Sequence, residues 1–172
     1  MKKITMIVAS LFIFLTACED YLDVNKNIDA PDYVEGYLYL AGIQQSYFGV
    51  YYEIRGLGPM TQMMGTTTSA YTNFANHYYA QGSDACGEIW RMTYWNQGMN
   101  LENMINQSLA AEEWTLAGIG YAIKAYSWDM LAKEHAELPM KQAFVDGLLS
   151  HDYDYQKDVY KQVREWAYKA IE

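Results

Sequence analysis

Apolar side chains recur at helical spacing along four stretches of the chain, and no stretch of any length alternates in the way of a half-buried strand. This spacing predicts an all-α fold, with helices at about 32–53, 85–109, 111–134 and 154–172. The apolar stripes of these helices are Val34, Leu38, Ala41, Phe48 and Tyr52; Trp90, Tyr94, Leu101, Ile105 and Leu109; Trp114, Ala117, Tyr121, Ala125, Trp128 and Leu131; and Val159, Tyr160, Val163, Trp166, Ala167, Ala170 and Ile171. We expect Trp114, Trp128 and Trp166 to lie in the core.

Glycine, proline and aspartate set the expected boundaries of these helices. Gly58 and Pro59 interrupt the chain after the first helix, and Pro139 stops any continuation of the third. Asp152 or Asp154 is expected to cap the fourth helix through its carboxylate. The chain ends at 172 in an amphipathic pattern without a stop signal, so we expect it to be the amino-terminal part of a longer protein.

The first residues read as an export signal. Lys2 and Lys3 precede an apolar run that ends in Leu15-Thr-Ala-Cys18, and this run is shorter than the roughly 20 residues of a membrane-spanning helix. A small residue before a cysteine is typical of bacterial lipoproteins. We therefore expect residues 1–17 to be a signal peptide and Cys18 to carry lipid, including palmitate.

The segment after Cys18 has a different composition from the helical region. Residues 18–31 are polar and show no sustained period, which is typical of a tether. Residues 32–172 then form the helical region. Cys86 is the only cysteine besides Cys18, so no internal disulfide is expected, and 17 Tyr, 5 Trp and 5 Phe supply the material for packing.

Charge excludes one class of partner. The chain carries a net charge of −9 and has no stripe of Lys and Arg. Binding to nucleic acid requires such a stripe for contacts with phosphates. A basic patch for anionic lipid is lacking for the same reason, which leaves the acyl chains as the link to a membrane.

No catalytic or metal-binding motif stands out. The three histidines are scattered, without an HExxH pair, and the aspartates at 152–158 lack the glycine and distal glutamate of a calcium loop. There is no Gly-rich phosphate loop, and Cys86 lies in no nucleophile motif. We expect no enzyme activity, no cofactor and no metal. A carboxylate pair of a glycoside hydrolase could still be formed by some of the 21 acidic residues.

The best candidate binding segment is the loop 66–83, which is rich in Thr, Ser, Asn and Gly and also in aromatic residues. Sugar rings stack their C–H faces on aromatic rings, and their hydroxyls pair with amides. Trp95 lies off the main stripe of its helix, next to Asn96. The candidate ligand residues are Tyr71, Asn73, Phe74, Asn76, Tyr78, Tyr79, Trp95 and Asn96. The alternative is that these aromatic rings cover the scaffold.

Several stretches share their order with a known pattern. The mature start is Cys18-Glu-Asp-Tyr-Leu-Asp23, followed by Asn25-Lys-Asn-Ile-Asp-Ala-Pro31. Then come Trp90-x-x-x-Tyr94 with Asn100-Leu-Glu-Asn103, the turn Ala136-Glu-Leu-Pro139-Met-Lys-Gln-Ala143-Phe144, and Tyr153-Asp-Tyr-Gln156. In content and order they resemble the SusD/RagB-like outer-membrane lipoproteins. The family turn reads G-D-I-P-Y-x-E-A, so Ala136-Glu137 departs from its Gly-Asp.

The resemblance implies a helical scaffold of tetratricopeptide-like helix pairs with long aromatic-rich loops. Trp114-x-x-Ala-Gly118-x-x-Tyr121 matches the first half of the tetratricopeptide pattern. It also implies a non-enzymatic lipoprotein of the outer surface, which binds an oligosaccharide or another nutrient and works with a SusC-like TonB-dependent outer-membrane transporter. Two alternatives remain: a structural transporter partner without ligand binding, and an anchored glycoside hydrolase fragment.

Overall fold

The predicted all-α class is confirmed by the computed structural model, which describes residues 34–65, 79, 80, 82, 87–145 and 147–172. These residues contain no β-strand, and an isolated antiparallel bridge joins Leu138 to Asp154. All contacts below lie within one unit, Glu35–Glu172. Its elements are α3 (Gly36–Gln45), α4 (Phe48–Met60), α6 (Gly87–Arg91), the π-helix η1 (Met92–Gln97), α7 (Gly98–Ala110), α8 (Trp114–His135) and α9 (Gln156–Lys169).

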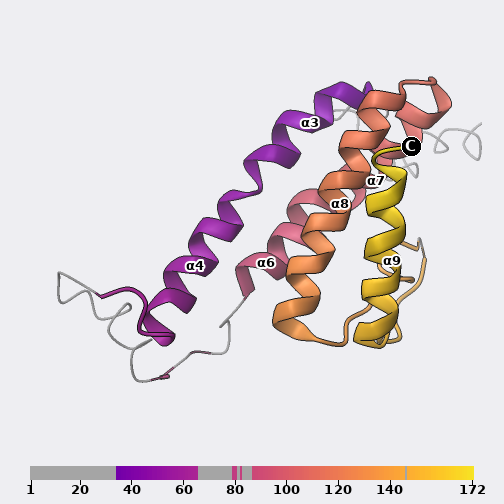
Figure 1. Ribbon diagram of the computed structural model, residues 1–172. Helices are drawn as coiled ribbons and strands as arrows, with labels where there is room; N and C mark the ends of the chain where they lie inside the picture. Colours follow the sequence, from indigo (N-terminus) through magenta and orange to yellow (C-terminus); the bar gives the residue numbers. More distant parts are fainter. Residues whose placement is uncertain (1–33, 66–78, 81, 83–86, 146) are drawn as a thin grey trace, which may run out of the picture. The chain divides into compact units, whose positions relative to one another are not determined.

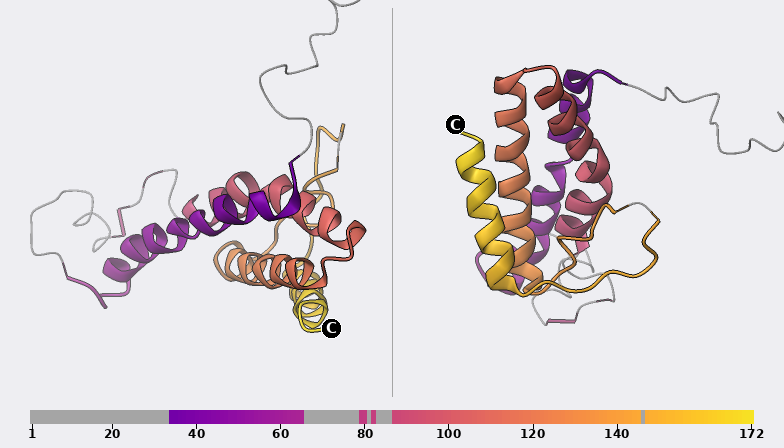
Figure 2. Two further views of the ribbon diagram at one scale, coloured as in Figure 1. Left: turned by 90° about the horizontal axis from the view of Figure 1, so that it is seen from above. Right: turned by 90° about the vertical axis from the view of Figure 1, so that its right-hand side faces the viewer.

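The helices pack as successive antiparallel neighbours (Figure 1). α3 and α4 run one way, α6, η1 and α7 return beside them, and α8 and α9 form an antiparallel pair. α8 contacts both α9 and α7, and α3 contacts α7. Figure 2 shows the long segment between α8 and α9 extending out beside α7 before the chain enters α9. Paired antiparallel helices of this kind agree with a tetratricopeptide-like scaffold.

Two apolar clusters form the core. The first holds Trp128 and Trp166, whose ring centroids are 6.1 Å apart. The second surrounds Ile43, where α3 meets α7 and α8. The buried residues of the first cluster are Ile89, Met92, Ala125, Trp128, Leu131, Ala132, Leu138, Met140, Val159 and Trp166, and those of the second are Ile43, Leu101, Met104, Ile105 and Ile123.

The expected burial of Trp128 and Trp166 is confirmed, but that of Trp114 is wrong. Trp114 begins α8 and is exposed, as is Leu109 in the last turn of α7. Both residues lie at helix ends, where a side chain has neighbours on one side only. Ile171 is exposed for the same reason, since α9 ends at Lys169. Periodicity therefore overstates burial at the start of α8 and at the ends of α7 and α9.

The first expected helix, 32–53, is two helices in the structure. A turn at Ser46 and Tyr47 separates α3 from α4. The hydroxyl of Ser46 donates to the carbonyl oxygen of Ile43, and such local side-chain bonds compete with the helical ladder. α4 then continues to Met60, so Gly58 and Pro59 do not interrupt it. Pro59 lies in the last turn of α4, where its missing N–H removes one helical hydrogen bond and the helix ends one residue later.

The second expected helix, 85–109, contains a π-helical segment. η1 spans six residues between α6 and α7, and Gly98 follows it with φ +25°. A left-handed φ of this size favours glycine, which has no Cβ to clash. π segments are rare and concentrate at functional sites. The change of phase also rotates side chains: Gln97 is buried, whereas Trp95 is 79% exposed.

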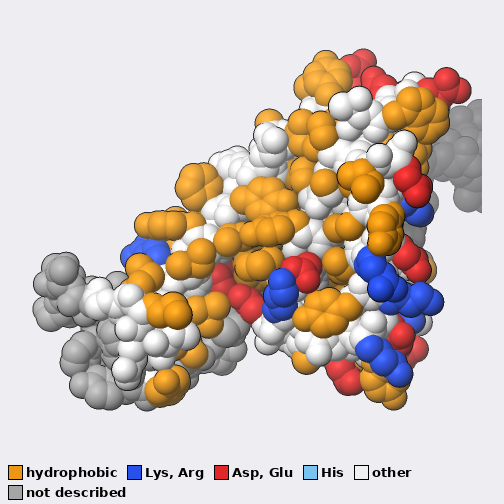
Figure 3. Space-filling view, in the orientation of Figure 1, with side chains coloured by type: hydrophobic (Ala, Val, Ile, Leu, Met, Phe, Trp, Pro, Cys, Tyr) orange, Lys and Arg blue, Asp and Glu red, His pale blue; other side chains and the backbone are white. Residues whose placement is uncertain are grey.

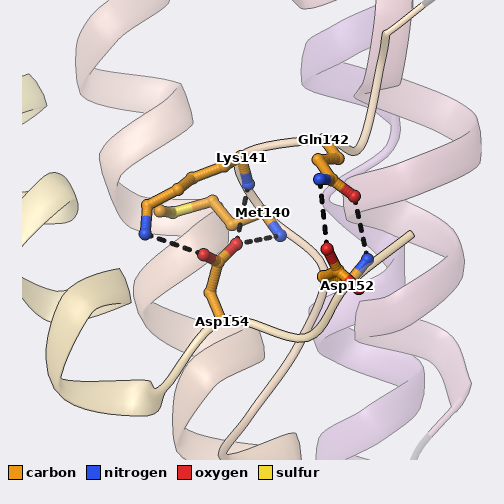
Figure 4. Close-up of polar contacts among 5 residues, drawn as sticks. All are labelled: Met140, Lys141, Gln142, Asp152 and Asp154. Atoms are coloured by element: carbon orange, nitrogen blue, oxygen red, sulfur yellow. Dashed lines mark hydrogen bonds and ion pairs between the residues drawn. The ribbon is translucent and has the colours of Figure 1, made fainter.

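Asp152 and Asp154 do not cap the fourth helix, because α9 starts after Tyr155 and has no side-chain cap. The carboxylate of Asp154 instead accepts the backbone N–H groups of Met140 and Lys141, at 3.0 and 2.9 Å (Figure 4). Asp152 pairs with the side chain of Gln142, whose Oε1 accepts the backbone N–H of Asp152 at 2.9 Å. Both aspartates therefore fix the segment after α8 rather than the start of α9.

Candidate functional site

An open cleft lies where α3 and α4 face α6, η1 and α7. Its volume is about 540 Å³. We call it the α3–α4 cleft. Its lining residues are Gly42, Gln45, Ser46, Phe48, Gly49, Tyr52, Glu88, Asn96 and Asn100.

Two glycines shape this cleft. A Cβ at Gly49 would lie 3.0 Å from the Cβ of Met92 and 3.1 Å from the carbonyl oxygen of Glu88. Glycine at this position therefore lets α4 approach α6 closely. A Cβ at Gly42 would meet nothing within 4 Å, so that side of the wall is open.

Aromatic rings and amides line the same cleft. Phe48 and Tyr52 lie four residues apart on α4 and are 62% and 52% exposed. At that spacing two side chains share one face of a helix. The amides come from Gln45 at the end of α3, Asn96 on η1 and Asn100 on α7. Flat apolar faces beside donors and acceptors are the combination that a carbohydrate requires.

The π-helix decides which polar groups reach the cleft. Asn96 lines it, while the neighbouring Gln97 turns inward and donates from Nε2 to Ser46 Oγ at 2.9 Å. This bond joins η1 to the turn between α3 and α4. The cleft wall is thus fixed at the point where both backbone segments depart from regular α-helix.

A buried carboxylate supports the wall from behind. Glu53 on α4 is 6% exposed and accepts the backbone N–H groups of Glu88 and Ile89, at 2.9 and 3.3 Å. A carboxylate is favourable at this helix start. Glu88 itself pairs with Arg91 at 2.6 Å.

Burial raises the pKa of Glu134 on α8 to about 7, and the negative charge of Glu53 adds to this rise.

The structure reaches only some of the residues expected from sequence. Asn96 lies in the cleft lining, and Trp95 lies beside it in the chain with its side chain in solvent. Tyr79 is exposed and is not among the lining residues. The expected lipid site and most of the aromatic loop lie outside the described residues: Cys18, Tyr71, Asn73, Phe74, Asn76 and Tyr78.

Sequence reasoning missed most of the cleft. The apolar stripe expected over 32–53 is wrong: Leu38 and Ala41 before the turn are exposed, as are Phe48 and Tyr52 after it. The buried residues of α3 are Gly36 and Ile43, and those of α4 include Gly49 and Glu53. Gln45 and Asn100 carry no local signal. The resemblance included Asn100, as the first residue of the stretch Asn100-Leu-Glu-Asn103, and nothing pointed to Gln45.

Neither a metal site nor a membrane span is found in the described residues. Within residues 34–65 and 87–172, apart from 146, no three His, Cys, Asp or Glu side chains are grouped as metal ligands. None of the helices described is both long and apolar enough to cross a bilayer.

Comparison with known proteins gives one match. The model of a SusD-like family, described as starch-binding and associating with the outer membrane, matches residues 36–171. No curated protein and no solved structure matched the chain. The matched range covers every helix among the described residues.

Proposed function

Because the chain belongs to the SusD-like family of starch-binding proteins associated with the outer membrane, we propose that it binds glycan without acting on it, and that the α3–α4 cleft is the glycan site. The observation that carries the proposal is the cleft's lining. Two exposed rings on one face of α4 line an open hollow together with the amides of Asn96 and Asn100.

The proposed location at the cell surface is supported by the sequence. The lipoprotein motif ending at Cys18 supports a lipid anchor, and the acidic Glu19 and Asp20 support display on the outer face. In this proposal residues 1–17 are removed, 18–31 form the tether and 32–172 form the binding region. Glycan captured here passes to a SusC-like TonB-dependent transporter.

One observation favours a second candidate function, that of a structural partner of the transporter. Apolar side chains crowd the visible face of α3 and α4 (Figure 3). The exposed apolar residues of these two helices include Tyr37, Leu38, Tyr51 and Ile54. Exposed apolar patches beyond a few hundred Å² are unusual on monomers and mark interaction sites. This surface lies on the same two helices as the cleft, so both functions are compatible.

Calorimetric or NMR titration with maltoheptaose tests the glycan site. We expect a Kd on the order of 1 mM for the chain, or about −4 kcal/mol. Tyr52→Ala and Phe48→Ala should each weaken binding by roughly fivefold, or about 1 kcal/mol, since each removes a stacking face. Asn96→Ala and Asn100→Ala should weaken it similarly, because each removes a hydrogen bond.

Tyr168→Ala is the matched control, because Tyr168 is an equally exposed tyrosine on α9 and lies outside the cleft. Its affinity for maltoheptaose should equal that of the parent chain. If the cleft variants are folded and bind as tightly as the control, the glycan site lies elsewhere, with the 66–83 loop next to be tested. Absence of saturable binding to any glycan would favour the structural partner.

A further inference from the structure

A second hollow lies on a different part of the unit, among α7, α8, α9 and the segment after α8. Its volume is about 470 Å³. We call it the lysine hollow. It is lined by Met99, Glu102, Asn106, Lys124, Met140, Lys141, Phe144, Val145, Gln162 and Trp166. It shares no lining residue with the α3–α4 cleft.

The floor of the lysine hollow holds a nearly buried cation. The side chain of Lys124 is 12% exposed, and its Nζ lies 2.5 Å from Glu102 Oε1. The same ammonium lies 4.4 Å from the centre of the Trp166 ring. A lysine so placed is held by charge and by the aromatic face together, and a partly dehydrated ammonium forms stronger contacts than one in water.

A second ammonium stands at the rim. Lys141 is largely exposed, and its Nζ lies 2.9 Å from Asp154 Oδ1. Asp154 also accepts the backbone N–H groups of Met140 and Lys141, so the rim is fixed by its own backbone (Figure 4). Phe144 also holds the segment after α8 in place, since its ring packs against that of Tyr94 with 6.2 Å between the ring centroids.

The lysine hollow is less negative than the chain as a whole. Its lining carries two lysines and one glutamate, and Asp154, the partner of Lys141, brings the local charge to about zero, whereas the chain carries a net charge of −9. The α3–α4 cleft, by contrast, has Glu88 as its single charged lining residue. Apolar walls from Met99, Met140 and Phe144 surround the lysines, and Asn106 and Gln162 add amides.

We propose that the lysine hollow is a separate binding site for a small ligand that bears a carboxylate. Lys124 and Lys141 supply charge-assisted hydrogen bonds to the carboxylate, the apolar wall contacts the body of the ligand, and the two amides pair with its hydroxyl or peptide groups. A uronic acid oligosaccharide and a short peptide with a free carboxyl terminus share this chemistry. The proposal stands independently of glycan binding in the α3–α4 cleft.

Titration of the purified chain with trigalacturonic acid, followed by NMR at the Trp166 indole N–H, tests the proposal. The methyl ester of the same trisaccharide removes the charge and keeps the rings. We expect saturable binding of the acid and at least about tenfold weaker binding of the ester, or about 1.4 kcal/mol. Added salt should weaken binding of the acid and leave the ester unchanged. Trialanine and its amide form the peptide arm; a preference there for the free acid supports the site and assigns it to peptides.

Two lysine variants test where the carboxylate of the ligand binds. Lys141→Gln should weaken binding of the preferred acid about threefold without changing the melting temperature much, because the side chain is exposed and Asp154 keeps its two backbone donors. Lys161→Gln removes the same charge from an exposed position of α9 outside the hollow and should have no effect. Lys141→Gln should also leave maltoheptaose affinity unchanged, which separates this site from the α3–α4 cleft. Equal binding of acid and neutral forms, equal effects of the two lysine variants, or no saturable binding up to about 50 mM would overturn the proposal.

Discussion

Replacing Glu134 by glutamine should remove part of the pH dependence of stability. Glu134 lies in the last turn of α8, where a carboxylate faces the unfavourable end of the helix dipole. Its Oε2 is buried and has no hydrogen-bond partner among the described residues. Burial therefore raises the pKa of Glu134 from its ordinary value of 4.5 to about 7, and the nearby charge of Glu53 adds to this rise. Glutamine keeps the shape and carries no charge.

The direction in which stability changes with pH follows from whether the folded or the unfolded chain binds the proton of Glu134 more tightly. The folded pKa of Glu134 lies above the unfolded one, so the folded chain keeps this proton at pH values where the unfolded chain has lost it. The resulting stabilisation is fully present below about pH 4.5 and is lost as the pH rises through about 7. Each pKa unit corresponds to about 1.4 kcal/mol, so the full shift would give roughly 3 kcal/mol. The side chain keeps 11% exposure, and screening by water reduces this to roughly 1–2 kcal/mol.

Urea unfolding at pH 5, 6, 7 and 8 measures the effect. The free energy of unfolding of the Glu134→Gln variant should fall less between pH 5 and 8 than that of the parent, by roughly 1–2 kcal/mol. Glu165→Gln, which removes an exposed carboxylate from α9, is the control and should follow the parent curve. Parallel curves for parent and Glu134→Gln would show that this carboxylate titrates as it does in water, and the account of its burial would be wrong.

Two further predictions concern packing and the membrane anchor. A Cβ at Gly120 would lie 2.5 Å from Cγ1 of Ile105, so Gly120→Ala should destabilise the fold by about 1–3 kcal/mol in urea unfolding, through overpacking of α8 on α7. Gly42→Ala, which meets open space, is its control, and equal effects of the two would contradict the close approach. Cys18→Ala should abolish acyl labelling and release the protein from the membrane fraction, and unchanged fractionation would refute lipidation.

The helices that sequence predicted best are those whose apolar stripes are long and uninterrupted. α8 and α9 were expected from spacing alone, and Trp128 and Trp166 lie in the core as predicted. In the middle of α8 and α9 the apolar stripe faces a neighbouring helix, whereas the stripe expected over 32–53 does not, since Leu38, Ala41 and Tyr52 are exposed. At the start of α8 such a neighbour is lacking, which is why Trp114 was placed wrongly.

Long-range hydrogen bonds could not be predicted in this way. Asp154 has the residue type and the sequence position expected of a helix N-cap, yet its carboxylate accepts a backbone N–H from 14 residues earlier in the chain. Glu53 accepts from the backbone of Glu88, 35 residues later. Neither partner is visible in local sequence, because it depends on how the helices pack. The resemblance identified the family, which the match over residues 36–171 confirms, but it predicted neither of these hydrogen bonds.

The residues of the α3–α4 cleft were poorly predicted from sequence, but the structure gives physical reasons for their positions. Trp95 and Asn96 were singled out because Trp95 lies off the apolar stripe of its expected helix, and both residues lie on η1 in the structure. A leucine in place of Gln97 would bury apolar surface without needing a partner. The chain instead buries an amide that bonds to Ser46 at the break between α3 and α4. Two irregular backbone segments joined by one buried hydrogen bond, with Asn96 facing the cleft one residue away, are better explained as positioning the cleft wall than as defects of packing.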